Sequence, residues 1–211
     1  MNMKNLLSFR LGLVLLSASL LLTSCDDEDD GLAIQPHDQN AMMSIMHSMM
    51  DKMEAMSMNE DPDIAFARMM IMHHQGAIDM SNEELNTGDD ATIRAMAQKI
   101  KEEQQKEIAE LQAFITSYQP DQPADNTFNM ELMSSMEKSG KQSDLQVLTG
   151  DTDQDFAQLM SVHHQSAIEN SRSVMEHGTS AEIKEMAHMM INAQMAEIQE
   201  LQEWLLANKS Y

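Results

Sequence analysis

Residues 66–80 read FARMMIMHHQGAIDM, and residues 156–170 read FAQLMSVHHQSAIEN. The two stretches align at an offset of 90, and the alignment continues without a gap from residues 66–114 to residues 156–204, with 20 of 49 positions identical. The chain therefore contains one module twice, and each copy carries the triplet His-His-Gln. A repeat of this length predicts one supersecondary unit per copy, which buries its apolar face against the other copy.

Helical signals fill each copy. Apolar residues recur at spacings of three and four, and no segment shows the alternation typical of strands. Asp61 and Pro62 suit an N-cap followed by the first helical position, and Gly88 and Gly178 stand where a helix should stop. Residues 179–182 have the spacing of a capping box that starts another helix. We therefore predict an antiparallel hairpin per copy, with helices of about 25 to 30 residues.

A shorter methionine-bearing segment precedes each hairpin, at residues 42–58 and 130–136. One hairpin alone would expose much apolar surface, whereas two hairpins packed together close a four-helix bundle. We therefore predict an all-α fold of two tandem hairpins, each preceded by a shorter helix. The predicted segments are a signal peptide (1–24), an acidic tether (25–39), the first repeat (40–119), a linker (120–127) and the second repeat (128–208).

The N-terminus resembles a lipoprotein export signal. Lys4 and Arg10 precede an apolar run over residues 11–22, which is shorter than the roughly 20 residues needed to span a bilayer. The run ends in residues 22–25, Leu-Thr-Ser-Cys, which resemble the box cleaved by the bacterial lipoprotein signal peptidase. We expect export and a membrane anchor on lipid-modified Cys25, in the cell envelope; a plain secretory signal is the alternative. The acidic residues 26–30 are either a solvated tether or an address for the outer face of the outer membrane.

The amino-acid composition limits the partners and the metal ligands that the protein can have. Without residues 1–24 the chain keeps 11 basic and 35 acidic side chains, a net charge of −24, so nucleic acid is not an expected partner. Cys25 is the only cysteine, which leaves soft-metal chemistry to histidine and to the 24 methionines. The sequence contains no phosphate loop, nucleophile elbow or His-Glu-x-x-His motif, and we therefore expect a protein that is not an enzyme.

The histidine pair of the first copy is the main candidate for metal ligands. Adjacent residues on a helix point about 100° apart, so His73 and His74 need separate neighbours. Met70 lies three residues before His73 and four before His74, and Met69 lies four before His73. Thioether sulfur and neutral imidazole suit a soft monovalent ion such as Cu(I) or Ag(I). The alternative is a structural pair that is held in the core by hydrogen bonds.

The second copy repeats this arrangement with one change. Met160 precedes His163 and His164 at the same spacings, but Leu159 stands where the first copy has Met69. We expect two Met–His sites related by duplication, with His74 and His164 turned toward the bundle interior and the other histidine of each pair turned sideways.

The first methionine-bearing segment holds eight methionines within residues 42–58. Methionine is a flexible core filler, but such density with hardly any leucine or isoleucine favours metal capture. The candidate ligands here are Met43, Met46, His47, Met49 and Met50. Glu185 and His188 have a spacing seen in di-iron bundles. The first copy lacks both residues at the equivalent positions, so we interpret this spacing as a coincidence.

The two quoted stretches resemble the signature of the bacterial family called domain of unknown function 305, and the resemblance covers nearly all of the mature chain, once per repeat. It implies a ferritin-like helical bundle. CopM-like members bind Cu(I) and Ag(I) and contribute to copper tolerance. By transfer, the ligands would be Met70, His73, His74, Met160, His163, His164 and the methionines around His47.

We therefore predict an envelope lipoprotein that sequesters or transfers Cu(I) or Ag(I). Two alternatives remain open: a metal-free helical interaction module with structural histidines, and a ferritin-like carboxylate di-iron protein.

Overall fold

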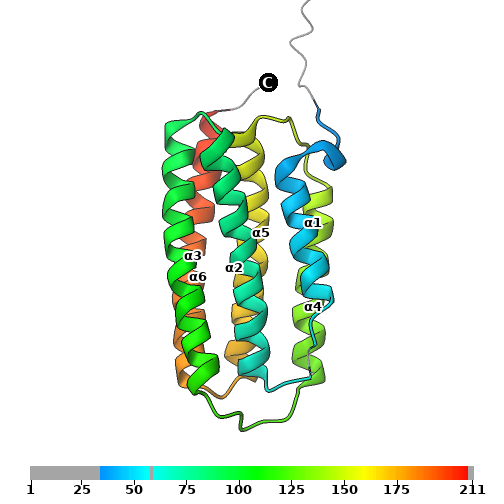
Figure 1. Ribbon diagram of the computed structural model, residues 1–211, viewed down its shortest axis with the longest axis vertical. Coiled ribbons are helices and arrows are strands. Elements are labelled where there is room, and N and C mark those ends of the chain that lie inside the picture. The colour runs from blue at the N-terminus through cyan, green and yellow to red at the C-terminus, as the bar shows by residue number, and fades with distance from the viewer. Residues whose placement is uncertain (1–33, 58, 209–211) are drawn as a thin grey trace, which may run out of the picture. The chain divides into compact units, whose positions relative to one another are not determined.

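The computed structural model describes residues 34–57 and 59–208 (Figure 1). The predicted signal peptide, Cys25 and Met58 lie outside these residues. The described residues form one short 3-10 helix, η1 (His37–Gln39), and six α-helices: α1 (Ala41–Glu54), α2 (Pro62–Thr87), α3 (Ala91–Ser117), α4 (Asn126–Asp144), α5 (Thr152–His177) and α6 (Ala181–Ala207). None of these helices is both long enough and apolar enough to cross a bilayer. The predicted all-α fold is confirmed, because α2/α3 and α5/α6 pack as hairpins and α1 and α4 are the shorter preceding helices.

The helices are arranged in three layers (Figure 1). α2 and α5 pack against each other in the middle, α3 and α6 lie on one side, and α1 and α4 lie on the other side. The central helices each bury 16 residues, whereas α3 and α6 each bury six. The outer helices are therefore amphipathic, and the two helices that carry His-His-Gln are buried on nearly all sides.

The predicted helix starts are correct for α2 and shifted by one residue for α6. The side chain of Asp61 accepts a hydrogen bond from the backbone N–H of Asp63, and Pro62 takes the first helical position. α6 is capped by Ser180, whose Oγ lies 3.3 Å from the backbone nitrogen of Ile183. The predicted capping box over residues 179–182 is wrong, because Thr179 is engaged by Asp63 instead.

Gly88 and Gly178 end α2 and α5, as predicted, but their φ angles of −68° and −70° are ordinary. Space is the reason for glycine at both positions. A Cβ on Gly88 would lie 2.1 Å from Glu84 Oε1, and a Cβ on Gly178 would lie 2.3 Å from Asp63 Oδ1. Buried carboxyl groups therefore occupy the volume that a side chain would need.

Two buried aspartates at equivalent repeat positions tie the hairpins together. Asp63 on α2 accepts hydrogen bonds of 3.0 Å from the backbone N–H groups of residues 179 and 180, at the start of α6. Asp153 on α5 accepts hydrogen bonds of 3.1 Å from residues 89 and 90, at the start of α3. Each copy thus caps a helix of the other copy, where a negative charge is favoured by the helix dipole. The exchange is reciprocal, as in two units that are related by a twofold axis; we therefore describe the two copies as related by a pseudo-twofold axis.

Part of the predicted tether is packed against the second copy. The backbone nitrogen of Gln35 donates to Leu148 O at 2.7 Å, and His37 Nε2 lies 2.9 Å from Gln146 O. The second copy begins inside the predicted linker 120–127, because the side chain of Asp125 caps α4.

Candidate metal centre

The two histidine pairs meet in one cluster. All four side chains are fully buried, and the rings of His73 and His163 stack with centroids 3.7 Å apart and planes 28° apart. The centroids of His73 and His74 are 6.3 Å apart, and those of His163 and His164 are 6.0 Å apart. This corrects the expectation of two separate pairs. His73 and His163 face the α2–α5 interface near the pseudo-twofold axis, so each histidine meets its equivalent in the other repeat.

His74 and His164 point toward the second helix of their own hairpins. His74 Nε2 lies 2.8 Å from Glu107 Oε2 on α3, and His164 Nε2 lies 3.0 Å from Glu197 Oε2 on α6. Both approaches are close but lack the alignment of a hydrogen bond. Sequence reasoning missed these glutamates, although Glu107 and Glu197 are an identical pair in the repeat alignment.

The environment keeps the central rings neutral. Burial is the largest cause that holds the pKa of His73 and of His163 well below the usual value, and the neighbouring imidazoles lower both pKa values further. The backbone of each residue acts on the ring of the other and opposes this only in part, in a geometry that does not meet the requirements of a hydrogen bond for His163. A neutral imidazole has one ring nitrogen with a free lone pair, which is the form that binds metals.

Most ring nitrogens of the cluster lack hydrogen-bond partners in the described structure, and His73 Nε2 is the exception. His73 Nε2 lies 2.8 Å from Ser166 Oγ, which in turn donates to His163 O at 2.8 Å. Within residues 34–57 and 59–208, neither nitrogen of His163 has a hydrogen-bond partner, and neither does Nδ1 of the other three histidines. Burying a polar atom without a partner costs about 1 to 3 kcal/mol, which favours the presence of a ligand or water at such atoms.

A thioether approaches this cluster from the methionine-bearing helix α1. A Cβ placed on Gly76 would lie 2.4 Å from Met49 Sδ and 3.4 Å from His163 Cε1. The absence of a side chain at Gly76 therefore lets Met49, from the first copy, approach His163 of the second copy. The equivalent position in the second copy is Ser166, whose hydroxyl group takes the space and contacts His73.

The other predicted sulfur ligands are core residues. Met69, Met70 and Met160 are buried on the central helices, and Met43 and Met46 are buried on α1. Met50 is partly buried against the same core.

His47 lies apart from these buried sulfurs. It is exposed, and its Nε2 lies 2.9 Å from Asp144 Oδ1 on α4. Methionine density on α1 is thus also explained by packing, because the buried methionines cover the second face of the central helices.

In the part of the chain that the structure describes, no three His, Cys, Asp or Glu side chains converge on one point where they could bind an ion together, and this includes the four clustered histidines. Glu185 and His188, which have the di-iron spacing, are both exposed on α6. A carboxylate di-iron centre therefore has no site among the described residues.

Fold and site together define a duplicated helical protein with a buried methionine–histidine core. The chain belongs to the family described as Domain of unknown function (DUF305), whose profile matches residues 19–115 and, overlapping them, residues 63–205. Two overlapping matches agree with the internal repeat.

Two solved structures of this family are similar to the chain. A DUF305 fragment from Deinococcus radiodurans has a TM-score of 0.53 at 18% identity, over 72% of this chain and 100% of that one. A DUF305 protein from Streptomyces coelicolor, named as a candidate secreted protein, has a TM-score of 0.55 at 24% identity, over 70% and 92%. These likenesses show the fold alone. No curated protein matches the chain.

Proposed function

We propose that this protein binds Cu(I), and by the same chemistry Ag(I), at its histidine cluster and so sequesters or transfers the ion without acting as an enzyme. One observation carries the proposal: buried, neutral imidazoles with unpartnered nitrogens lie beside the thioether of Met49 in the described structure. Imidazole and thioether are donors that suit a soft monovalent ion. Met70 and Met160, predicted as ligands by their spacing, are buried on the same helices.

The carboxylates near the outer histidines fit this role. Ligating histidines commonly direct their second nitrogen at a carboxylate, which fixes the orientation of the ring and raises its basicity. Glu107 and Glu197 lie next to Nε2 of His74 and His164, so Nδ1 is the nitrogen left for an ion. Complete burial would also keep a bound Cu(I) away from oxidants in water.

An envelope location would give such sequestration a purpose, because free Cu(I) would redox-cycle outside the cytoplasm. The lipoprotein-like signal ending at Cys25 supports export and lipid anchoring, and the name of the Streptomyces relative agrees with export. The net charge of −24 of the chain without residues 1–24 would concentrate cations in general near the protein.

The same glutamates favour a second candidate function. If His74 and His164 serve only to hold Glu107 and Glu197 inside the hairpins, the protein is a metal-free helical module that acts through its surface. This alternative predicts that metal ions do not change the stability of the fold.

The test is a titration of the mature protein with Cu(I) against the chelator bicinchoninate. His163→Leu removes the two unpartnered nitrogens and places an apolar side chain in the core, so the variant should fold. We expect micromolar or tighter binding, of which H163L loses at least one equivalent and the matched control H47A/H188A, which changes two exposed histidines, loses none. Binding weaker than micromolar, or equal binding by H163L and the wild type, would reject the proposal.

A further inference from the structure

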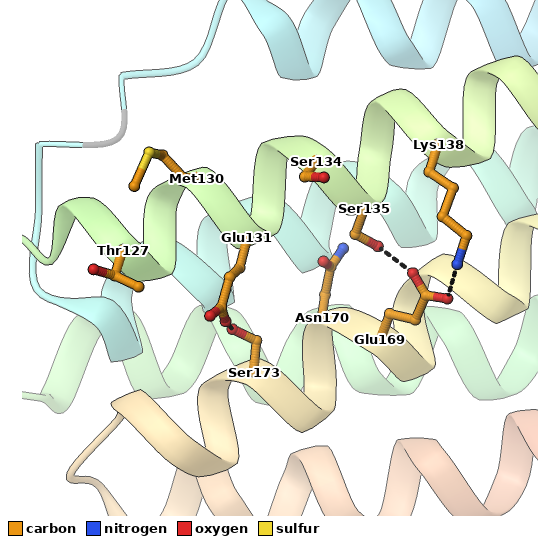
Figure 2. A pocket seen from close by; sticks show the side chains of 9 residues that line it. All are labelled: Thr127, Met130, Glu131, Ser134, Ser135, Lys138, Glu169, Asn170 and Ser173. Atoms are coloured by element: carbon orange, nitrogen blue, oxygen red, sulfur yellow. Dashed lines mark hydrogen bonds and ion pairs between the residues drawn. The ribbon is translucent and has the colours of Figure 1, made fainter.

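A surface groove of about 370 Å³ runs between α4 and α5 (Figure 2). Asn170 rises from α5 into this groove, between the Ser135–Glu169 and Glu131–Ser173 contacts. Only 1% of Asn170 is exposed, so its amide forms the floor of the groove. The groove thus connects solvent with a buried polar side chain that the histidine cluster does not use.

Two thioethers converge on this amide. Met136 Sδ, from α4, lies 3.4 Å from Asn170 Nδ2, and Met69 Sδ, from α2, lies 3.7 Å from the same atom. Each methionine is 2% exposed. Asn170 Oδ1 is also buried and has no hydrogen-bond partner within the described part of the chain. Three helices from both copies therefore bring two sulfurs to one amide group. Rotation of this amide by 180° about its Cβ–Cγ bond would exchange Nδ2 and Oδ1 and point the unpartnered oxygen at the two sulfurs.

From this geometry we infer a second site for a soft monovalent cation, formed by Met69, Met136 and Asn170 and separate from the histidine cluster. An amide N–H is a weak partner for thioether sulfur, whereas Cu(I) and Ag(I) are strong ones. The inference goes beyond the proposed function and does not depend on binding by the histidines.

The register of the repeat places sulfur here in both copies. At an offset of 87 Met49 is the equivalent of Met136, and at an offset of 90 Met80 is the equivalent of Asn170 and Leu159 that of Met69. Each of the two related sites thus has two methionines among its three positions, Met69 and Met136 here and Met49 and Met80 at the other. Packing alone would require only apolar side chains of similar volume at these positions.

The rim of the groove suits a cation. Glu131 and Glu169 both line it, and Lys138 pairs with Glu169. Met130 stands at the same groove with 65% of its surface exposed, which places a further thioether in solvent. A soft cation therefore has a carboxylate-lined route from solvent to the floor at Asn170.

The test uses the full mature chain with carbon-13 labels on the methionine methyl groups, titrated with Ag(I) and followed by NMR. We expect the methyl signals of Met69 and Met136 to shift as Ag(I) is added. M69L/M136L should bind one equivalent less than the wild type. The control M42L/M190L, which changes two other buried methionines, should bind as the wild type does. Methionine-to-leucine changes conserve volume, and circular dichroism checks that both variants fold.

Histidine nitrogen-15 signals, recorded in the same titration, separate this inference from the proposed function. If Ag(I) shifts the ring signals of His163 but leaves both methyl signals unmoved, the second site does not exist and the histidine site stands. If both methyl signals move while His163 does not, the second site stands and the histidine site fails. Equal stoichiometry for M69L/M136L and the wild type would also overturn the inference.

Discussion

Glu84 should make the protein less stable as pH rises through neutrality. Its side chain is fully buried, and this burial is the largest cause that raises the pKa of Glu84 to about 8. The neighbouring carboxyl group of Asp153 raises this pKa further, through hydrogen bonding and through its negative charge. In the unfolded chain the Glu84 carboxyl group ionises near its ordinary value of 4.5. The folded state therefore holds a proton that the unfolded state releases. The resulting stability is fully present below pH 4.5 and is lost as pH rises toward 8.

The size of the effect follows from the two pKa values. One pKa unit corresponds to about 1.36 kcal/mol. Between pH 5.5 and pH 7.5 the unfolded group is already ionised and the folded group is still mostly protonated, so the contribution of Glu84 falls by about 2 to 3 kcal/mol. Glu84→Gln is neutral at every pH and nearly the same shape, and so removes this loss.

Urea unfolding at pH 5.5 and pH 7.5, followed by circular dichroism, measures the effect. The free energy of unfolding of E84Q minus that of the wild type should increase by about 2 to 3 kcal/mol between the two pH values. Groups that titrate in both proteins, such as Glu103, cancel in this difference. A change below about 1 kcal/mol would refute the reasoning, since it would show that folded Glu84 is ionised at neutral pH.

Three further predictions follow from the described contacts. Asp63→Ala should lower the free energy of unfolding by about 3 kcal/mol, because two backbone N–H groups at the start of α6 lose their charged acceptor; a loss below about 1 kcal/mol in urea unfolding would contradict the capping role. The hydrogen bond that His177 Nδ1 donates to Asp125 raises the pKa of His177, so His177→Gln should lower the melting temperature at pH 5.5 and change it little at pH 8.5; equal losses would show that charge is not involved. Gly76→Ser should weaken Cu(I) binding roughly tenfold, about 1.4 kcal/mol, by displacing Met49, whereas S166G should not; unchanged affinity in G76S would remove Met49 from the site.

The fold was largely readable from the sequence because its signals are local. The N-cap at Asp61, the glycines at 88 and 178 and the spacing of apolar residues define helices without knowledge of the rest of the chain. The gap-free repeat then predicts the same helical hairpin in both copies. The third layer was less visible, because periodicity alone does not show that the four methionine and isoleucine residues 69–72 are covered from two sides.

The sequence indicated which histidines and methionines are candidate ligands, but only part of their geometry. Spacing along α2 shows that His73 and His74 point in different directions, but it does not show how α2 is rotated against α5. That rotation makes His73 meet His163, and Gly76 leaves room for Met49 of α1 near the His163 ring. The contacts that join helices distant in sequence, such as Glu84 with Asp153, depend on the same packing.

The stacked pair of His73 and His163 is an isologous contact, of the kind seen when two identical subunits associate around a twofold axis. In a homodimer, every substitution at such an interface appears twice. Within one chain the two sides vary independently, and here they have diverged. In the repeat alignment Gly76 corresponds to Ser166, Met69 to Leu159 and Met80 to Asn170. The duplication therefore gives this protein two different environments on the two sides of one symmetric core, which no pair of identical subunits could have.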